Sequence, residues 1–179
     1  TVTYVEGRVD VLKENTTMAV PLREGELVFP KDIIRTKSNS KAEITFKDKS
    51  MLRLAQNSRV EITDYQLDEQ GRRKKATVNL LRGKARTIIA KMNPGTDFNI
   101  LTPNSQGKIK GSDVFAFFQA GVSGMLVSSG TLSVANTAYP KDAIIVPPGN
   151  SVVVPQAQIP KGPRPYLEME KKFHEQDTN

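Results

Sequence analysis

Apolar and polar residues alternate with a period of two along much of this chain, and that pattern constrains its fold more than any other feature. The clearest stretch is Lys41–Lys47, where every second residue from Ala42 onward is apolar and the residues between are polar or charged. Successive side chains of a β-strand point to opposite faces, so this stretch predicts a strand with one buried face and one solvated face. The same pattern recurs in residues 51–54, 59–63 and 77–80, and further strands are expected at residues 84–89, 124–128 and 131–134.

Short turn sequences separate these segments at close intervals. Lys47–Ser50, Ser129-Gly130 and Pro147–Asn150 are rich in residues that favour turns. Many short strands joined by regular turns are typical of sandwiches, jelly rolls and solenoids. The sequence therefore predicts an all-β domain, an antiparallel β-sandwich or jelly roll, with a solenoid-like arrangement as the alternative. From the alternation we expect a core made of Val9, Val11, Leu27, Ile34, Ala42, Ile44, Phe46, Leu52, Leu54, Val60, Ile62, Val78, Leu80, Val114, Leu132, Val134, Ile145 and Val153.

The C-terminal part of the chain departs from this pattern. Residues 159–165 contain three prolines, which exclude a helix interior or a central strand and predict an extended connector. Residues 166–179 are rich in Glu and Lys, with Tyr166, Met169 and Phe173 at helical spacing. We therefore expect a β domain over residues 1–158, a connector over 159–165, and a short C-terminal helix and tail over 166–179.

The composition argues against most enzyme classes. The 179 residues include no Cys and a single His, which excludes disulfides, thiolate metal sites and a cysteine nucleophile. That residue, His174, lies close to the C-terminus, so we expect it to be solvated and not to act as a catalytic base. The acids Asp64, Asp68 and Glu69 flank an evident turn, where solvated carboxylates are ordinary. We expect no enzyme activity, no metal and no cofactor.

The formal net charge of +7 is concentrated in one segment. Residues 71–110 carry ten basic side chains and one acidic side chain, whereas the segments on either side are close to neutral. A concentrated basic stretch attracts phosphates or acidic partners, and salt weakens that attraction. The simpler interpretation is a solvated turn followed by a strand whose outward face is Lys and Arg. The candidate residues for binding an anion or partner are Arg72, Arg73, Lys74, Lys75, Arg82, Lys84 and Arg86, the last three on one strand face.

Several segments match, in collinear order, the sequence pattern of one known domain family. The start of the pattern is matched by Gly7–Val11, Pro21–Leu27 and Lys31–Thr36. Its strand, turn and following strand are matched by Ser40–Leu54. Its later segments are Val78–Lys84, Leu101–Pro103, Lys110–Val114, Gly130–Val134 and Pro148–Val152. Together these segments cover roughly residues 5–155, and in this order they resemble the FecR domain family. Two residues depart from the family pattern, because Lys49 stands where Gly is usual and Ser112 where Thr is usual.

This resemblance implies a non-catalytic, extracytoplasmic β domain of a bacterial envelope. The name-giving members of the family pass an iron-uptake signal from an outer-membrane transporter to a sigma factor. We therefore expect a periplasmic or secreted protein. The chain begins at Thr1 and not at Met, which fits removal of an export signal, with a lipid anchor on the precursor as a further option.

Two hypotheses of function follow. In the first, the chain is an interaction or signalling module, and an exposed sheet edge or loop receives a strand or helix of a partner protein. In the second, the basic stretch 71–91 binds an envelope polyanion such as acidic glycan, peptidoglycan or lipopolysaccharide. Nucleic acid is not expected, because 6% aromatic residues offer few stacking platforms and no helix suited to the major groove precedes the tail.

Overall fold

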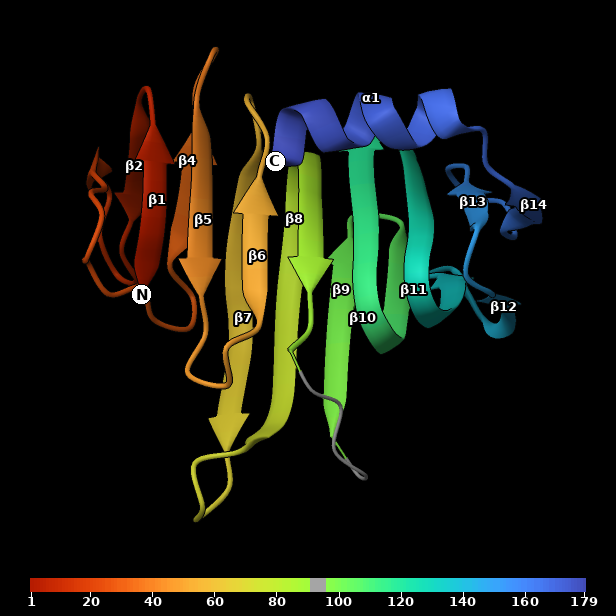
Figure 1. Cartoon of the computed structure of the whole chain (residues 1–179), viewed down its shortest axis with the longest axis horizontal. Coiled ribbons are helices and arrows are strands. Elements are labelled where there is room, and N and C mark those ends of the chain that lie inside the picture. The colour runs from red at the N-terminus through yellow and green to blue at the C-terminus, as the bar shows by residue number, and fades with distance from the viewer. Residues whose placement is uncertain (91–95) are drawn as a thin grey trace.

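A computed structural model describes residues 1–90 and 96–179 of the chain. These residues form fourteen β-strands and one C-terminal helix. The strands belong to one hydrogen-bonded sheet, which folds over on itself so that two layers enclose the core (Figure 1). The predicted all-β fold with a short terminal helix is confirmed.

The front layer is the one that the helix crosses (Figure 1). Its strands pair in the order β1-β5-β6-β8-β10-β11-β13-β14, with β8 and β10 contributing their C-terminal halves and β11 its N-terminal half. The bounds of these strands are β1 Val2–Glu6, β5 Lys41–Thr45, β6 Met51–Leu54, β8 Arg73–Ile88, β10 Ser105–Gln119, β11 Val122–Asn136, β13 Asn150–Val154 and β14 Lys161–Pro165.

The back layer contains the remaining strands and the other halves of the three long ones. It pairs in the order β3-β2-β4-β7-β8-β9-β10-β11-β12. All of the pairs in both layers are antiparallel except β8 with β9, which is parallel. The bounds are β2 Val9–Leu12, β3 Val20–Pro21, β4 Ile33–Thr36, β7 Arg59–Leu67, β9 Asp97–Thr102 and β12 Tyr139–Val146.

Three long strands join the layers, because each bends and takes part in both. β8 pairs with β7 and β9 before Gly83 and with β6 and β10 after it. Gly83 has φ +89°, and a Cβ there would lie 2.4 Å from Ser58 Oγ, so the bend requires glycine. The bends in β10 and β11 meet at Gly111 and Gly130, where a Cβ on Gly111 would lie 2.3 Å from the Gly130 Cα.

These bends correct part of the sequence interpretation. The separate strands predicted at 77–80 and 84–89 are the two halves of β8, and those predicted at 124–128 and 131–134 are the two halves of β11. Ser129-Gly130, predicted as a turn, lies inside β11 for the same reason. Glycine breaks a strand at a turn and also allows a strand to bend, so the sequence pattern is the same for both.

The core lies between the layers and contains most of the predicted residues. Three predicted core residues are wrong. Leu27 is 55% exposed because it lies in the loop between β3 and β4, outside any strand. Ile145 is 61% exposed on β12, which has a partner strand on one side only. Val153 is half-buried, because its neighbours Val152 and Val154 are the residues that point into the core.

The C-terminal segment docks on the front layer. Residues 161–165 of the expected connector are extended and also pair with β13 as the edge strand β14. The helix α1 spans Glu168–Thr178, and its N-terminus is capped by Glu170, whose carboxylate accepts a 2.7 Å hydrogen bond from the Leu167 backbone N–H. In the part of the chain that the structure describes, no helix is long and apolar enough to span a membrane.

Candidate functional site

The bend at Gly83 divides the seven candidate basic residues between different surfaces. Five of them form ion pairs with acids of this chain, and the pairs are Arg72–Asp68, Arg73–Asp48, Lys75–Asp64, Lys84–Asp177 and Arg86–Asp113. Lys74 and Arg82 are exposed and form no ion pair with any residue that the structure describes. The stretch therefore does not form one continuous basic surface. Lys91, at its end, lies outside the described residues.

Arg73 is part of the core and not of any surface. Its side chain is 2% exposed and donates hydrogen bonds to Asp48 and, over 2.9 Å, to Ser50. The guanidinium also lies 5.4 Å from the centre of the Phe98 ring. Removing a charge from water is costly, so such a group needs its partners, and Arg73 is accordingly a structural residue.

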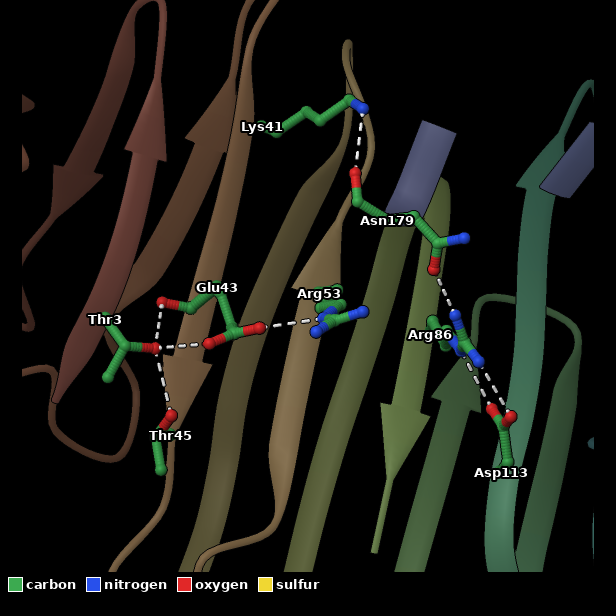
Figure 2. Close-up of polar contacts among 8 residues, drawn as sticks. All are labelled: Thr3, Lys41, Glu43, Thr45, Arg53, Arg86, Asp113 and Asn179. Atoms are coloured by element: carbon green, nitrogen blue, oxygen red, sulfur yellow. Dashed lines mark hydrogen bonds and ion pairs between the residues drawn. The ribbon is translucent and has the colours of Figure 1, made fainter. Parts of the chain in front are cut away.

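Lys84 and Arg86 hold the helix against the front layer. Lys84 Nζ lies 2.6 Å from the carboxylate of Asp177 on α1 and 3.5 Å from the centre of the Phe173 ring. Arg86 binds Asp113 through two hydrogen bonds of 2.9 Å and donates a third to the side chain of Asn179. Two residues of the predicted binding stretch therefore bind this chain's own C-terminal segment, and Figure 2 shows the contact of one of them, Arg86, with Asn179.

A row of charged residues crosses the outer face of the front layer (Figure 2). Glu43, Arg53 and Arg86 lie directly opposite one another on β5, β6 and β8. Arg53 donates a 2.7 Å hydrogen bond to Glu43, and Asp113 on β10 pairs with Arg86. Burial opposes ionisation of Glu43, but hydrogen bonds from Thr3 and Arg53 outweigh it and lower its pKa. Arg53 is thus neutralised by Glu43, and Arg86 by Asp113.

An apolar groove lies between α1 and the rim of the front layer. Its volume is about 520 Å³, and Phe117 on β10 and Lys84 lie on its sheet side. On the helix side, Leu167, Met169 and Phe173 are 66%, 77% and 57% exposed. These three side chains do not pack into the core, although Met169 and Phe173 have the spacing expected of a docking face. The helix is held by its charged and C-terminal residues, and its apolar residues are left at the surface.

His174 closes the inner end of this groove, so the prediction that it is solvated is wrong. It is 8% exposed, and its ring stacks on Phe117 with centroids 5.6 Å apart and an angle of 13° between the planes. Burial lowers the pKa of His174, and the Lys84 ammonium lowers it further, while Asp177 and Glu170 act in the opposite direction. The helix docks over the sheet because α1 follows the edge strand β14. The position of His174 near the C-terminus does not reveal this docking, so its burial could not be predicted from the sequence.

The acidic residues near the β7–β8 turn have structural roles. Asp64 pairs with Lys75 at 3.0 Å. Asp68 accepts hydrogen bonds from the backbone N–H groups of Gln70 and Arg72, each 2.9 Å long, and this closes the turn. Within residues 1–90 and 96–179 no three His, Cys, Asp or Glu side chains are grouped so that they could hold a metal ion.

Comparison with known protein families shows which family the chain belongs to. The family model described as FecR protein matches residues 32–137, which is more than half of the chain. The chain belongs to the FecR family. The match spans the strands from β4 to β11 and therefore includes the three bent strands that join the layers.

Solved structures share the fold of this FecR domain. Two crystal structures of a "putative anti-sigma factor" from Parabacteroides distasonis ATCC 8503 superpose on it with TM-scores of 0.62 and 0.58. They are 14% and 15% identical in sequence and cover 79% and 74% of the FecR domain chain. The chain spans 64% and 60% of their own length. Among curated proteins no sequence matches it.

Proposed function

We propose that this FecR domain is a non-catalytic regulatory module that binds another protein in the bacterial envelope, in the periplasm or outside the cell. Membership of the FecR family supports the regulatory role and the envelope. The fold shared with a protein described as an anti-sigma factor fits the same role. The lack of a thiol, with one buried His held between aromatic rings, favours binding over catalysis.

The groove at α1 is the observation that carries this proposal. Exposed apolar side chains that are grouped, and not scattered singly, mark protein interaction sites. Leu167 directly precedes the short helix that carries Met169 and Phe173, and Phe117 extends their apolar surface onto the sheet. The partner is a protein segment with an apolar face, which would cover these side chains as a helix or strand laid along the groove.

The alternative, in which residues 71–91 bind an envelope polyanion, gains no observation in its favour. Five of the seven candidate cations already have an acidic partner in this chain. Arg73 is buried, and Lys84 and Arg86 lie under the helix. A polyanion would have to displace those contacts.

Photocrosslinking tests the proposal directly. A photoreactive amino acid placed at Met169, in cells that make the protein, should give a crosslinked product that mass spectrometry identifies as one protein. The control is the same amino acid at Met18, which is 79% exposed, close to the 77% of Met169, but distant from the groove. A defined partner from Met169 and none from Met18 is expected. Equal products from both positions, or none from either, would contradict the groove as the binding site.

A further inference from the structure

A row of arginines crosses the outer face of the back layer. Arg35 on β4 lies opposite Arg59 on β7, which in turn lies opposite Arg82 on β8, with a bulge directly before Arg82. The acid in this row is Asp10, which pairs with Arg35 at 2.5 Å and with Lys37 at 3.1 Å. Like charges directly opposite each other in a sheet are destabilising.

The far end of this row carries uncompensated charge. Arg59 and Arg82 are exposed and form no ion pair within the described part of the chain. Glu61, two residues after Arg59 on the same strand, is the next acid along β7 and makes no ion pair with either arginine. A repulsion that the chain leaves in place is explained if a ligand of opposite charge relieves it.

A hollow of about 960 Å³ continues the basic surface beyond Asp10. Asp10 and Lys37 line it together with Arg8 and Arg23, neither of which forms an ion pair with a described residue. The other acid that lines it, Glu24, accepts a 2.9 Å hydrogen bond from the Val5 backbone N–H. The row and the hollow therefore form one strip in which cations outnumber acids.

The front layer shows what covers such a row in this fold. There Arg53 and Arg86 also lie opposite each other, and the acidic C-terminal end of α1 lies across the strands above them (Figure 2). Asp177 binds Lys84, and Asn179 binds Arg86 and, through its backbone oxygen, Lys41 at 3.0 Å. The back row also places arginines opposite one another, but among the described residues no helix lies over it, and of its three arginines Arg35 alone has an acidic partner.

We propose that the back arginine row, Arg35, Arg59 and Arg82, binds an acidic helical segment of a protein partner. Neighbouring strands are about 4.8 Å apart, so the three arginines repeat at that interval. The Cβ atoms of residues three or four apart on a helix are about 5–6 Å apart, whereas alternate residues of an extended strand are about 6.6 Å apart. A helix laid across the strands therefore matches the row more closely than a strand does. Guanidinium groups bind carboxylates through paired hydrogen bonds, which favours Glu or Asp on that helix.

This surface does not depend on the groove at α1, and its test uses other residues. The probe is an alanine-based helical peptide with Glu at positions i, i+4 and i+7, and its control carries Gln at those positions. The protein variants are Arg59→Ala/Arg82→Ala and the matched Lys74→Ala/Lys110→Ala, which also removes two exposed positive charges. Binding is measured by titration calorimetry at low salt and repeated with added salt.

The wild type should bind the Glu peptide in preference to the Gln peptide, and added salt should weaken the binding. Arg59→Ala/Arg82→Ala should lose about tenfold in affinity or more, and Lys74→Ala/Lys110→Ala should bind like the wild type. The melting temperature of the arginine variant should not fall, because the substitution relieves a repulsion. Equal losses in both variants, or no binding of the Glu peptide by the wild type, would overturn the proposal. Stronger binding of heparin or phosphatidylglycerol vesicles than of the peptide, lost in the same arginine variant, would replace the helical partner with a polyanion.

Discussion

Lys84 on β8 places its ammonium 3.5 Å from the centre of the Phe173 ring on α1, while its other contact is the carboxylate of Asp177. One side chain of the sheet thus holds Phe173 and Asp177, which lie one turn apart on the same face of the helix. This contact and that of Arg86 with Asn179 hold α1 on the rim of the front layer, where the groove lies. The position of α1 should therefore depend on Lys84.

Lys84→Met tests that dependence. The substitution removes the ion pair and the cation–π contact, and should lower the free energy of unfolding by about 1 kcal/mol. Hydrogen exchange of the α1 amides should become faster, while that of the core strands changes little. Lys74→Met, at an exposed lysine without an ion pair among the described residues, is the control. Unchanged exchange in α1 would show that the helix is held by other contacts.

The docking of α1 should weaken in acid because of His174. Burial lowers the pKa of His174 in the folded chain, so between that value and the ordinary value of about 6.5 the unfolded chain binds the additional proton. The stability that His174 contributes is therefore complete above about pH 6.5 and declines as the pH falls below it.

Chemical denaturation of the wild type and of His174→Leu at pH 8 and pH 5 measures this effect. The wild type should lose more stability than the variant over that interval, since Leu fills the space beside Phe117 without a titrating group. The remaining acids and bases, including Lys84, Asp177 and Glu170, are common to both proteins. The same pH dependence in both would exclude His174 as its source.

Adjacent arginines of the basic stretch should differ in their effects on stability. Arg73 is buried with Asp48, so Arg73→Ala leaves an unpaired carboxylate and should cost about 3–5 kcal/mol. Arg72 pairs with Asp68 at the surface, with a side chain 59% exposed, and Arg72→Ala should cost about 1 kcal/mol or less. Urea denaturation of both variants checks the difference, and similar losses would contradict the buried position of Arg73.

Glycine should be required at the bend of β8 and replaceable at the β7–β8 turn. Gly83 and Gly71 have similar φ values, +89° and +74°, so both substitutions to Ala share the backbone cost of about 1 kcal/mol. Only at Gly83 would the added Cβ also meet Ser58, whereas nothing lies within 4 Å at Gly71. Gly83→Ala should therefore lower the melting temperature clearly more than Gly71→Ala. Equal effects would show that contact with Ser58 does not enforce the bend.

Local patterns in the sequence were sufficient for the strands and for most of the core. Alternation placed Ile44 and Leu52 correctly, because one buried face is a property of each strand alone. In the run Ser151–Val154 three consecutive valines fit either face, so the choice of Val153 was wrong. The bend at Gly83 was not predicted, because the sequence of a bend resembles that of a turn.

The candidate site depended on contacts between distant residues, which no local pattern contains. Arg73 pairs with Asp48, which lies 25 residues earlier in the chain. Lys84 pairs with Asp177, and these two residues are 93 positions apart. The basic stretch was visible as a cluster of charge, but its partners were not. His174 was expected in water for the same reason, because its burial depends on α1 crossing the sheet.

Binding of the crosslinked partner to matched variants tests the central claim, that the α1 groove is a protein-binding site. The test variant is Met169→Ser/Phe173→Ser, and the control is Met18→Ser/Phe29→Ser, whose side chains are 79% and 56% exposed, against 77% and 57% in the groove. Titration calorimetry with the purified partner should show a loss of about tenfold or more for the groove variant, as for central apolar contacts of an interface, and wild-type affinity for the control. Wild-type affinity in the groove variant would contradict the account.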